Sequence, residues 1–129
     1  MQDYLVYLIV TIILYVLLFV FPGFTLSKGK SSEPNSVIGF RTKRSSLSKE
    51  TWIYANTLAG KLILLYGHFY LIINILIFIF MNIFALSETV TIYLFYIQAG
   101  LFVLLYFIMY IKVQSKLKSE FDVNSNRRH

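Results

Sequence analysis

The chain contains no cysteine and few charged residues. Without cysteine it has no disulfide framework, no thiolate metal site and no cysteine nucleophile. Charged residues make up 14% of the 129 residues and fall into a few blocks, which is too little polar surface to cover a water-soluble core. Hydrophobic residues reach 57%, and the mean hydropathy is +0.68. These values indicate a membrane protein, and a single membrane domain over residues 1–129 is the simplest interpretation.

Three apolar runs are long enough to cross a bilayer as α-helices. The first covers about residues 4–21 and, at ~1.5 Å per residue, just spans a hydrocarbon core of ~30 Å. Pro22 and Gly23 are expected to end it. The other two cover about residues 57–85 and 90–111, and the turn between them is short enough to make them a helical hairpin. The sequence therefore predicts an all-α membrane protein with three transmembrane helices.

Two other interpretations of these runs fit the sequence less well. A cleaved signal peptide needs a basic N-terminal region and a small-x-small cleavage site, whereas Asp3 is the only charge before the first run, which ends in Phe-Pro-Gly-Phe. A soluble helical core needs a polar stripe on each helix, which the second and third runs lack. We therefore expect the first helix to be retained as a membrane span.

The twelve lysine and arginine residues are confined to two parts of the chain. They lie in the first loop (about residues 23–56) or just after it at Lys61, and in the basic tail (residues 112–129). The N-terminal stub and the second loop carry Asp3 and Glu88 instead. Because basic residues in short loops resist translocation, we predict an outside N-terminus, an inside C-terminus and a structured basic cytoplasmic loop between helices 1 and 2.

The net charge of +6 also raises nucleic-acid binding as an interpretation. Juxtamembrane Lys and Arg gain about 1 kcal/mol each near an anionic leaflet, and the predicted topology requires them in any case. The tail has no aromatic interleaving and no recognition-helix pattern. We therefore expect these charges to meet the lipid bilayer, with no direct binding of nucleic acid.

The first loop contains its own signals for local order. Residues 28–34 are rich in Gly, Ser and Pro and are expected to form a flexible connector. Gly39 permits a turn, and Arg41 offers a planar fork suited to carboxylate, phosphate or helix-end carbonyls. Ser48 is expected to N-cap a helix that has Glu50 in its first turn and runs into the second span.

If that helix is unbroken, Asn56, Gly60, Gly67 and Asn74 fall within about 40° of one another on one small, polar face. Such a face packs closely against another helix, here the first or the third; the alternative is a cleft for a ligand or a peptide. His68 lies on a different face. A lone histidine cannot build a metal site, so a packing role or a local hydrogen bond is expected, with a proton-sensitive role as the alternative.

Residues 34–61 also contain a motif in two parts. The first part is Pro34-Asn35 followed by Ile38-Gly39-Phe40-Arg41-Thr42, and the second is Trp52, Ala55-Asn56 and Gly60-Lys61. This order resembles the signature of the SdpI family of bacterial integral membrane proteins, in which G-[YF]-R-T precedes W-x-x-A-N-x-x-x-G-[KR] by about ten residues. The resemblance implies a multi-pass protein of the bacterial cytoplasmic membrane.

The resemblance further implies toxin (bacteriocin) immunity or membrane signalling, with a secreted peptide toxin or a cytoplasmic transcriptional repressor as partner. No cofactor is implied. The candidate partner-binding residues are Gly39, Phe40, Arg41, Thr42, Trp52, Asn56, Gly60 and Lys61, and the candidate intramembrane polar residues are His68 and Asn74.

Two other function classes fit the sequence less well than immunity does. A holin-like pore former is also small and often has three spans, but holin loops are short and pore formation needs no ordered motif such as the one in this loop. An enzyme is not expected, because the sequence lacks cysteine, a paired-carboxylate site, a G-x-S-x-G motif and a second intramembrane histidine.

Overall fold

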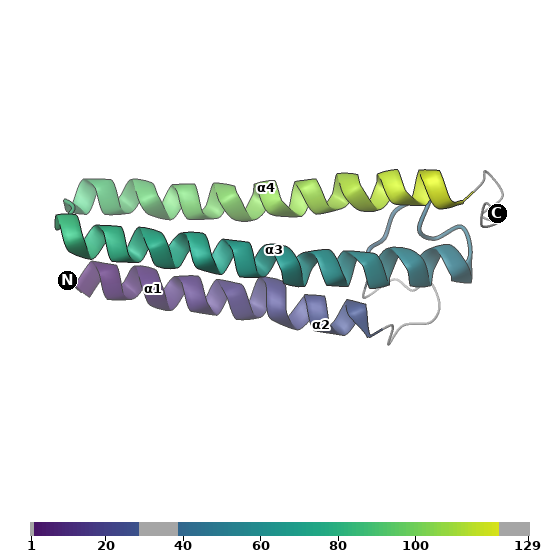
Figure 1. The fold of residues 1–129 in the computed structure, drawn as a ribbon, viewed down its shortest axis with the longest axis horizontal. Coiled ribbons are helices and arrows are strands. Elements are labelled where there is room, and N and C mark those ends of the chain that lie inside the picture. The colour runs from purple at the N-terminus through teal and green to yellow at the C-terminus, as the bar shows by residue number, and fades with distance from the viewer. Residues whose placement is uncertain (1, 29–38, 122–129) are drawn as a thin grey trace.

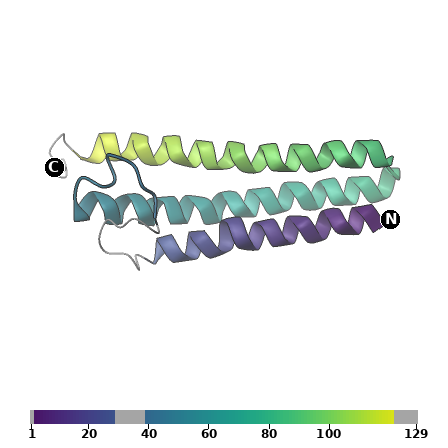
Figure 2. The same ribbon diagram turned by 180° about the vertical axis from the view of Figure 1, so that it is seen from behind.

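The computed structural model describes residues 2–28 and 39–121, and these form three long helical segments that lie side by side with α3 in the middle (Figures 1 and 2). Each segment is long and apolar enough to cross a membrane. The predicted all-α, three-span membrane protein is confirmed at this level. Along the chain the elements are α1 (Gln2–Tyr15), the π-helix η1 (Val16–Val20), α2 (Phe21–Ser27), α3 (Lys49–Phe84) and α4 (Glu88–Glu120).

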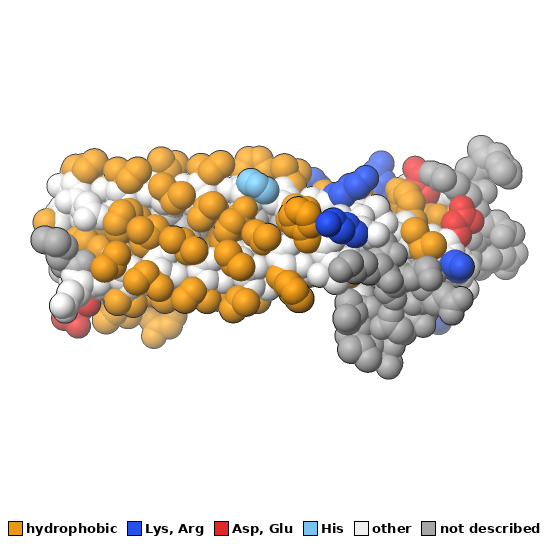
Figure 3. Space-filling view, turned by 90° about the horizontal axis from the view of Figure 1, so that it is seen from below, with side chains coloured by type: hydrophobic (Ala, Val, Ile, Leu, Met, Phe, Trp, Pro, Cys, Tyr) orange, Lys and Arg blue, Asp and Glu red, His pale blue; other side chains and the backbone are white. Residues whose placement is uncertain are grey.

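The two ends of the bundle differ in charge. One end, here called the turn end, carries the start of α1 and the turn between α3 and α4; the other, the loop end, carries residues 39–48 and the end of α4 (Figure 1). Figure 3 shows hydrophobic side chains over the body of the bundle, while the described Lys and Arg gather towards the loop end. A surface this apolar is suited to contact with lipid tails.

Pro22 and Gly23 do not end the first helix, which corrects the expectation from the sequence. The helix widens to π geometry in η1 and then continues through both residues to Ser27. Pro22 lacks the N–H that the carbonyl of Leu18 would accept in an α-helix. The hydroxyl of Tyr106 on α4 donates to that carbonyl instead. A partner from another helix thus satisfies the backbone group that proline leaves without a donor.

Gly23 serves close packing rather than termination. A Cβ atom at Gly23 would lie 2.6 Å from Cγ of Leu64 on α3, so a larger residue would push α2 and α3 apart. Small residues are typical of helix contacts in membranes for this reason.

Both ends of α3 form as the sequence predicts. Ser48 is the N-cap and its side chain accepts a hydrogen bond from the N–H of Thr51 at 3.1 Å, with Glu50 in the first turn. At the other end Ala85 takes the left-handed conformation, and Ser87 caps α4 two residues later. The predicted helical hairpin is confirmed.

The third predicted span ends later than the sequence indicated. The apolar run predicts a helix that stops near residue 111 and is followed by a tail, but α4 continues to Glu120. Val113 and Leu117 of this extension are apolar and buried, and so is Phe121, the residue that follows its last turn. The ring of Phe121 packs edge to face on Tyr54 of α3, 5.4 Å between centroids. Residues 122–129 of the predicted tail lie outside the described residues.

Candidate functional site

The first half of the sequence motif folds into a compact turn around Ser45, which is fully buried. Its hydroxyl donates to the carbonyl of Phe40 at 2.8 Å and accepts from the N–H of Thr42, also at 2.8 Å. The Ser45 N–H donates to the Thr42 hydroxyl at 3.2 Å, and the hydroxyl of Thr51 donates to the Ser45 carbonyl at 3.1 Å. These bonds hold residues 40–45 in one conformation and tie them to the start of α3.

Asn56 joins this loop to α3. The side-chain oxygen of Asn56 accepts from the backbone N–H of Phe40 at 2.5 Å, and its amide nitrogen donates to the carbonyl of Trp52 at 2.9 Å. Asn56 is only 4% exposed. An apolar replacement would leave the N–H of Phe40 without this acceptor in a buried place, which is costly.

Gly39 and Trp52 complete the same contact. Gly39 has φ = 131°, a conformation that residues with a side chain rarely adopt. A Cβ atom there would lie 2.7 Å from both Asn56 Oδ1 and the Trp52 ring. The Trp52 ring itself has 0% exposure. Gly39, Trp52 and Asn56 therefore form one packed unit, and in the described structure Trp52 presents no surface to a partner.

Gly60, in the second half of the motif, packs α3 against α2. A Cβ atom on Gly60 would overlap the backbone nitrogen of Ser27 and lie 2.8 Å from the carbonyl oxygen of Gly23. Ala55 and Ala59 are also fully buried. The small face predicted for α3 is thus used for packing within the chain, the first of the two interpretations drawn from its spacing.

Further along α3, that face joins a polar layer shared by all three helical segments. The Tyr7 hydroxyl of α1 donates to Asn74 Oδ1 at 2.5 Å, while Asn74 Nδ2 donates to the carbonyl of Tyr70 at 2.8 Å. Beside it, Gln98 of α4 donates to the hydroxyl of Thr11 on α1. Of these residues, Asn74 is the one that the sequence singled out, by its place on the small, polar face of the second span.

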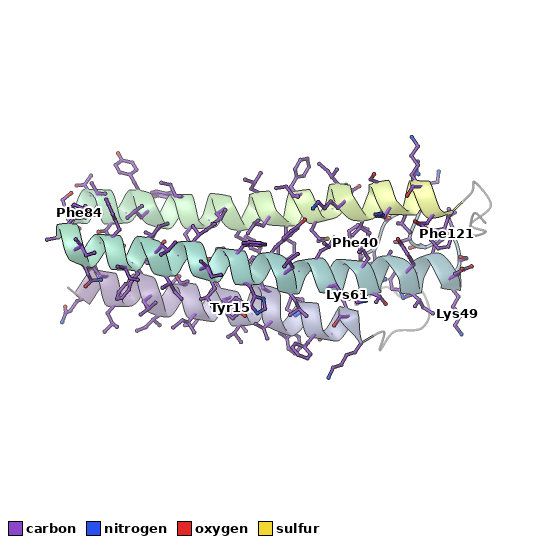
Figure 4. All side chains as sticks on the ribbon, in the orientation of Figure 1. Tyr15, Phe40, Lys49, Lys61, Phe84 and Phe121 are labelled. Atoms are coloured by element: carbon purple, nitrogen blue, oxygen red, sulfur yellow. The ribbon has the colours of Figure 1, made fainter. Side chains whose placement is uncertain are left out.

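His68 and Lys61 lie away from this packing. The Nδ1 atom of His68 is 2.6 Å from the carbonyl oxygen of Leu64, its own helix, and its ring meets Tyr15 edge to face at 6.0 Å. This is the local hydrogen bond expected of a lone histidine. Lys61, labelled on α3 in Figure 4, is exposed. Neither residue joins the Gly39 and Asn56 unit.

A groove opens where α2 and α4 diverge at the loop end. It has a volume of about 560 Å³ and is walled by residues of α2 and α4, with Ile63 of α3 also lining it. Residues 39–42 line it as well, and the ring of Phe40 packs on Tyr110 of α4 with centroids 5.7 Å apart. Figure 2 shows the loop reaching from α3 across to α4, and Figure 4 labels Phe40 between these helices. Arg41 is exposed and lines this groove.

A family model covers the motif and the two spans that follow it, matching residues 32–111. The chain belongs to the SdpI/YfhL protein family. No curated protein and no solved structure matches the chain.

Within this SdpI/YfhL family member, the motif residues divide by position. Gly39, Trp52, Asn56 and Gly60 fix the loop and the helices, whereas Arg41 lies exposed at the groove. Pro34, Asn35 and Ile38 of the motif lie outside the described residues, as do residues 29–34 of the predicted connector.

No pattern in the sequence marks the groove itself. Its walls include Met109, Tyr106 and Tyr110 of α4, which look like ordinary span residues in the sequence. They become a site only because the first helix continues past Pro22 and sets α2 opposite α4. In residues 2–28 and 39–121, no three His, Asp or Glu side chains lie close enough to hold a metal ion.

Proposed function

We propose that this SdpI/YfhL family protein protects a cell from a secreted peptide toxin, which it recognises at the Arg41 edge of the groove. The supporting observation is that Gly39, Trp52 and Asn56 hold the loop on α3, with Arg41 exposed beside an apolar groove. A guanidinium on a fixed backbone offers directed hydrogen bonds to carboxylate groups, and the groove accepts apolar side chains. Together these suit an amphipathic peptide lying in the membrane interface.

The charge at Arg41 is expected to be necessary for protection. Arg41→Ala should reduce survival of toxin-challenged cells to that of cells without the protein. Because the Arg41 side chain is exposed, the amount of protein in the membrane should stay within about twofold of wild type. The measurements are survival against a panel of peptide bacteriocins and membrane level by immunoblot.

Arg44→Ala is the matched control, since Arg44 is an exposed arginine of the same loop that does not line the groove. It should keep full protection. If Arg41→Ala also keeps it, the proposal is wrong. Loss of membrane potential on expression of the wild type without toxin would favour the holin-like pore instead.

The loop end is proposed to face the cytoplasm, because the described basic residues gather there. The cysteine-free sequence makes this testable with single cysteines. A membrane-impermeant maleimide should label Thr89→Cys at the turn end in intact cells. Labelling of Arg44→Cys at the loop end should be at least about tenfold greater in permeabilised cells than in intact cells. Labelling of Arg44→Cys in intact cells would invert the proposed orientation.

A further inference from the structure

We infer that the groove between α2 and α4 binds one anionic phospholipid, with its phosphate at Arg41 and an acyl chain along the apolar walls. This site goes beyond toxin recognition, since it concerns the protein at rest in its own membrane. The shape of the groove, its depth in the bilayer and its charge all favour such a ligand.

The shape of the groove suits a chain-like apolar ligand. Its volume of about 560 Å³ lies within the ~300–1,000 Å³ typical of small-molecule sites. Ile63 and Met109, both nearly inaccessible, are among the residues that line it. Phe21 of α2 and Tyr110 of α4 also line it and are 71% and 46% exposed. Exposed aromatic residues at these positions point to an opening towards the surrounding lipid.

The depth of the groove is given by where the apolar spans end. On α2 the lining residues stop at Leu26, two residues before Lys28; on α4 they stop at Tyr110, two residues before Lys112. Such basic and aromatic residues mark the headgroup level. The groove thus occupies the last turns of the hydrocarbon region, and Arg41 at its loop-end edge lies where lipid phosphates lie.

The charge of the groove favours an anionic headgroup. Of the described residues that line it, Arg41 carries the only charge, and no carboxylate lines it. Guanidinium and phosphate form paired hydrogen bonds of matching geometry. Basic pockets between membrane helices at this level are established sites for anionic headgroups in other proteins. A lipid offers a phosphate to the positive edge of the groove and an acyl chain to its apolar walls.

The test uses the purified full chain with phosphatidylglycerol and phosphatidylcholine of identical acyl chains, and native mass spectrometry counts the lipids retained. The wild type should retain one phosphatidylglycerol with about fivefold preference over phosphatidylcholine, the effect expected of one basic residue near an anionic surface. Arg41→Gln should retain phosphatidylglycerol and phosphatidylcholine about equally. Arg44→Gln should keep it, because Arg44 does not line the groove.

A second variant tests the walls rather than the charge. Thr25→Phe adds a ring on the α2 wall and should reduce retention of both lipids by at least about threefold. Leu76→Phe adds a ring on the exposed face of α3 outside the groove and should retain lipid as the wild type does. Emission of the buried Trp52, the only tryptophan, reports whether each variant keeps the folded loop.

Equal retention of the two lipids by the wild type would overturn the inference. So would an equal loss of preference in Arg41→Gln and Arg44→Gln, or a co-purified peptide in place of lipid. The assay contains no toxin, so its failure is separate from failure of the proposed function. Lipid selectivity in a protein that gives no protection would support the lipid site and contradict the toxin proposal.

Discussion

Gly39→Ala is expected to release the motif loop from α3. The added Cβ would lie 2.7 Å from the Trp52 ring and from Asn56 Oδ1, and alanine would have to hold φ = 131°. The conformation alone costs about 1–3 kcal/mol, and the overlap adds to it. The loop should therefore leave its place and expose Trp52. We expect a red shift of the Trp52 emission and loss of toxin protection.

Ser46→Ala is the control for this change. Ser46 is exposed on the same loop, and its backbone N–H, which donates to the Thr42 carbonyl at 3.1 Å, is unaffected by the substitution. The Trp52 emission of the Ser46→Ala protein should match that of the wild type. A Gly39→Ala protein with unchanged Trp52 emission would show that the loop does not need glycine there, and our account of the motif would fail.

Gly60→Ala is expected to separate α2 from α3. Its Cβ would meet backbone atoms of Ser27, Gly23 and Leu26, and backbone cannot move aside as the end of a side chain can. Overpacking of this kind costs about 1–3 kcal/mol. Unfolding of the protein in detergent micelles, followed by circular dichroism as temperature or denaturant rises, should occur earlier than in the wild type. Because α2 is one wall of the groove, lipid retention should fall as well.

Gly100→Ala provides the matched control on α4. Apart from its two chain neighbours and the backbone of its own helix, no heavy atom of the described residues lies within 4 Å of the Cβ that would be added there, and the residue is exposed. Alanine is the better helix former by about 1 kcal/mol, so this variant should be as stable as the wild type or more so. Equal stability of Gly60→Ala and Gly100→Ala would contradict the packing that the structure shows at Gly60.

The sequence predicted much of the fold because the signals were local. Apolar runs of sufficient length gave the three spans, and Ser48 gave the start of α3. The predicted ends of the first and third helices were wrong because these ends depend on contacts between distant parts of the chain. Pro22 is tolerated because Tyr106, far along the chain, supplies the missing donor, and α4 extends because Phe121 packs on Tyr54. Rules based on residues close together in the sequence take no account of partners from distant segments.

The candidate site divides in the same way. Its motif was recognisable, and the small face of α3 was correctly expected to suit close packing. The roles of individual residues were not readable, since Trp52 and Arg41 are equally prominent in the motif. In the structure Trp52 is fully buried, whereas Arg41 is exposed at the groove. Partner binding by these residues stays a prediction.

By itself, the sequence determined that this chain forms three helices apolar enough to cross a membrane, with its basic residues gathered in the first loop, at Lys61 and in the tail. Hydropathy and charge act residue by residue, so they can be read from the sequence. Only the tertiary structure decided that Gly39, Trp52 and Asn56 meet and that α2 and α4 diverge into a groove edged by Arg41. Those features depend on which side chains from distant segments fill the same space, and that is settled when the helices pack.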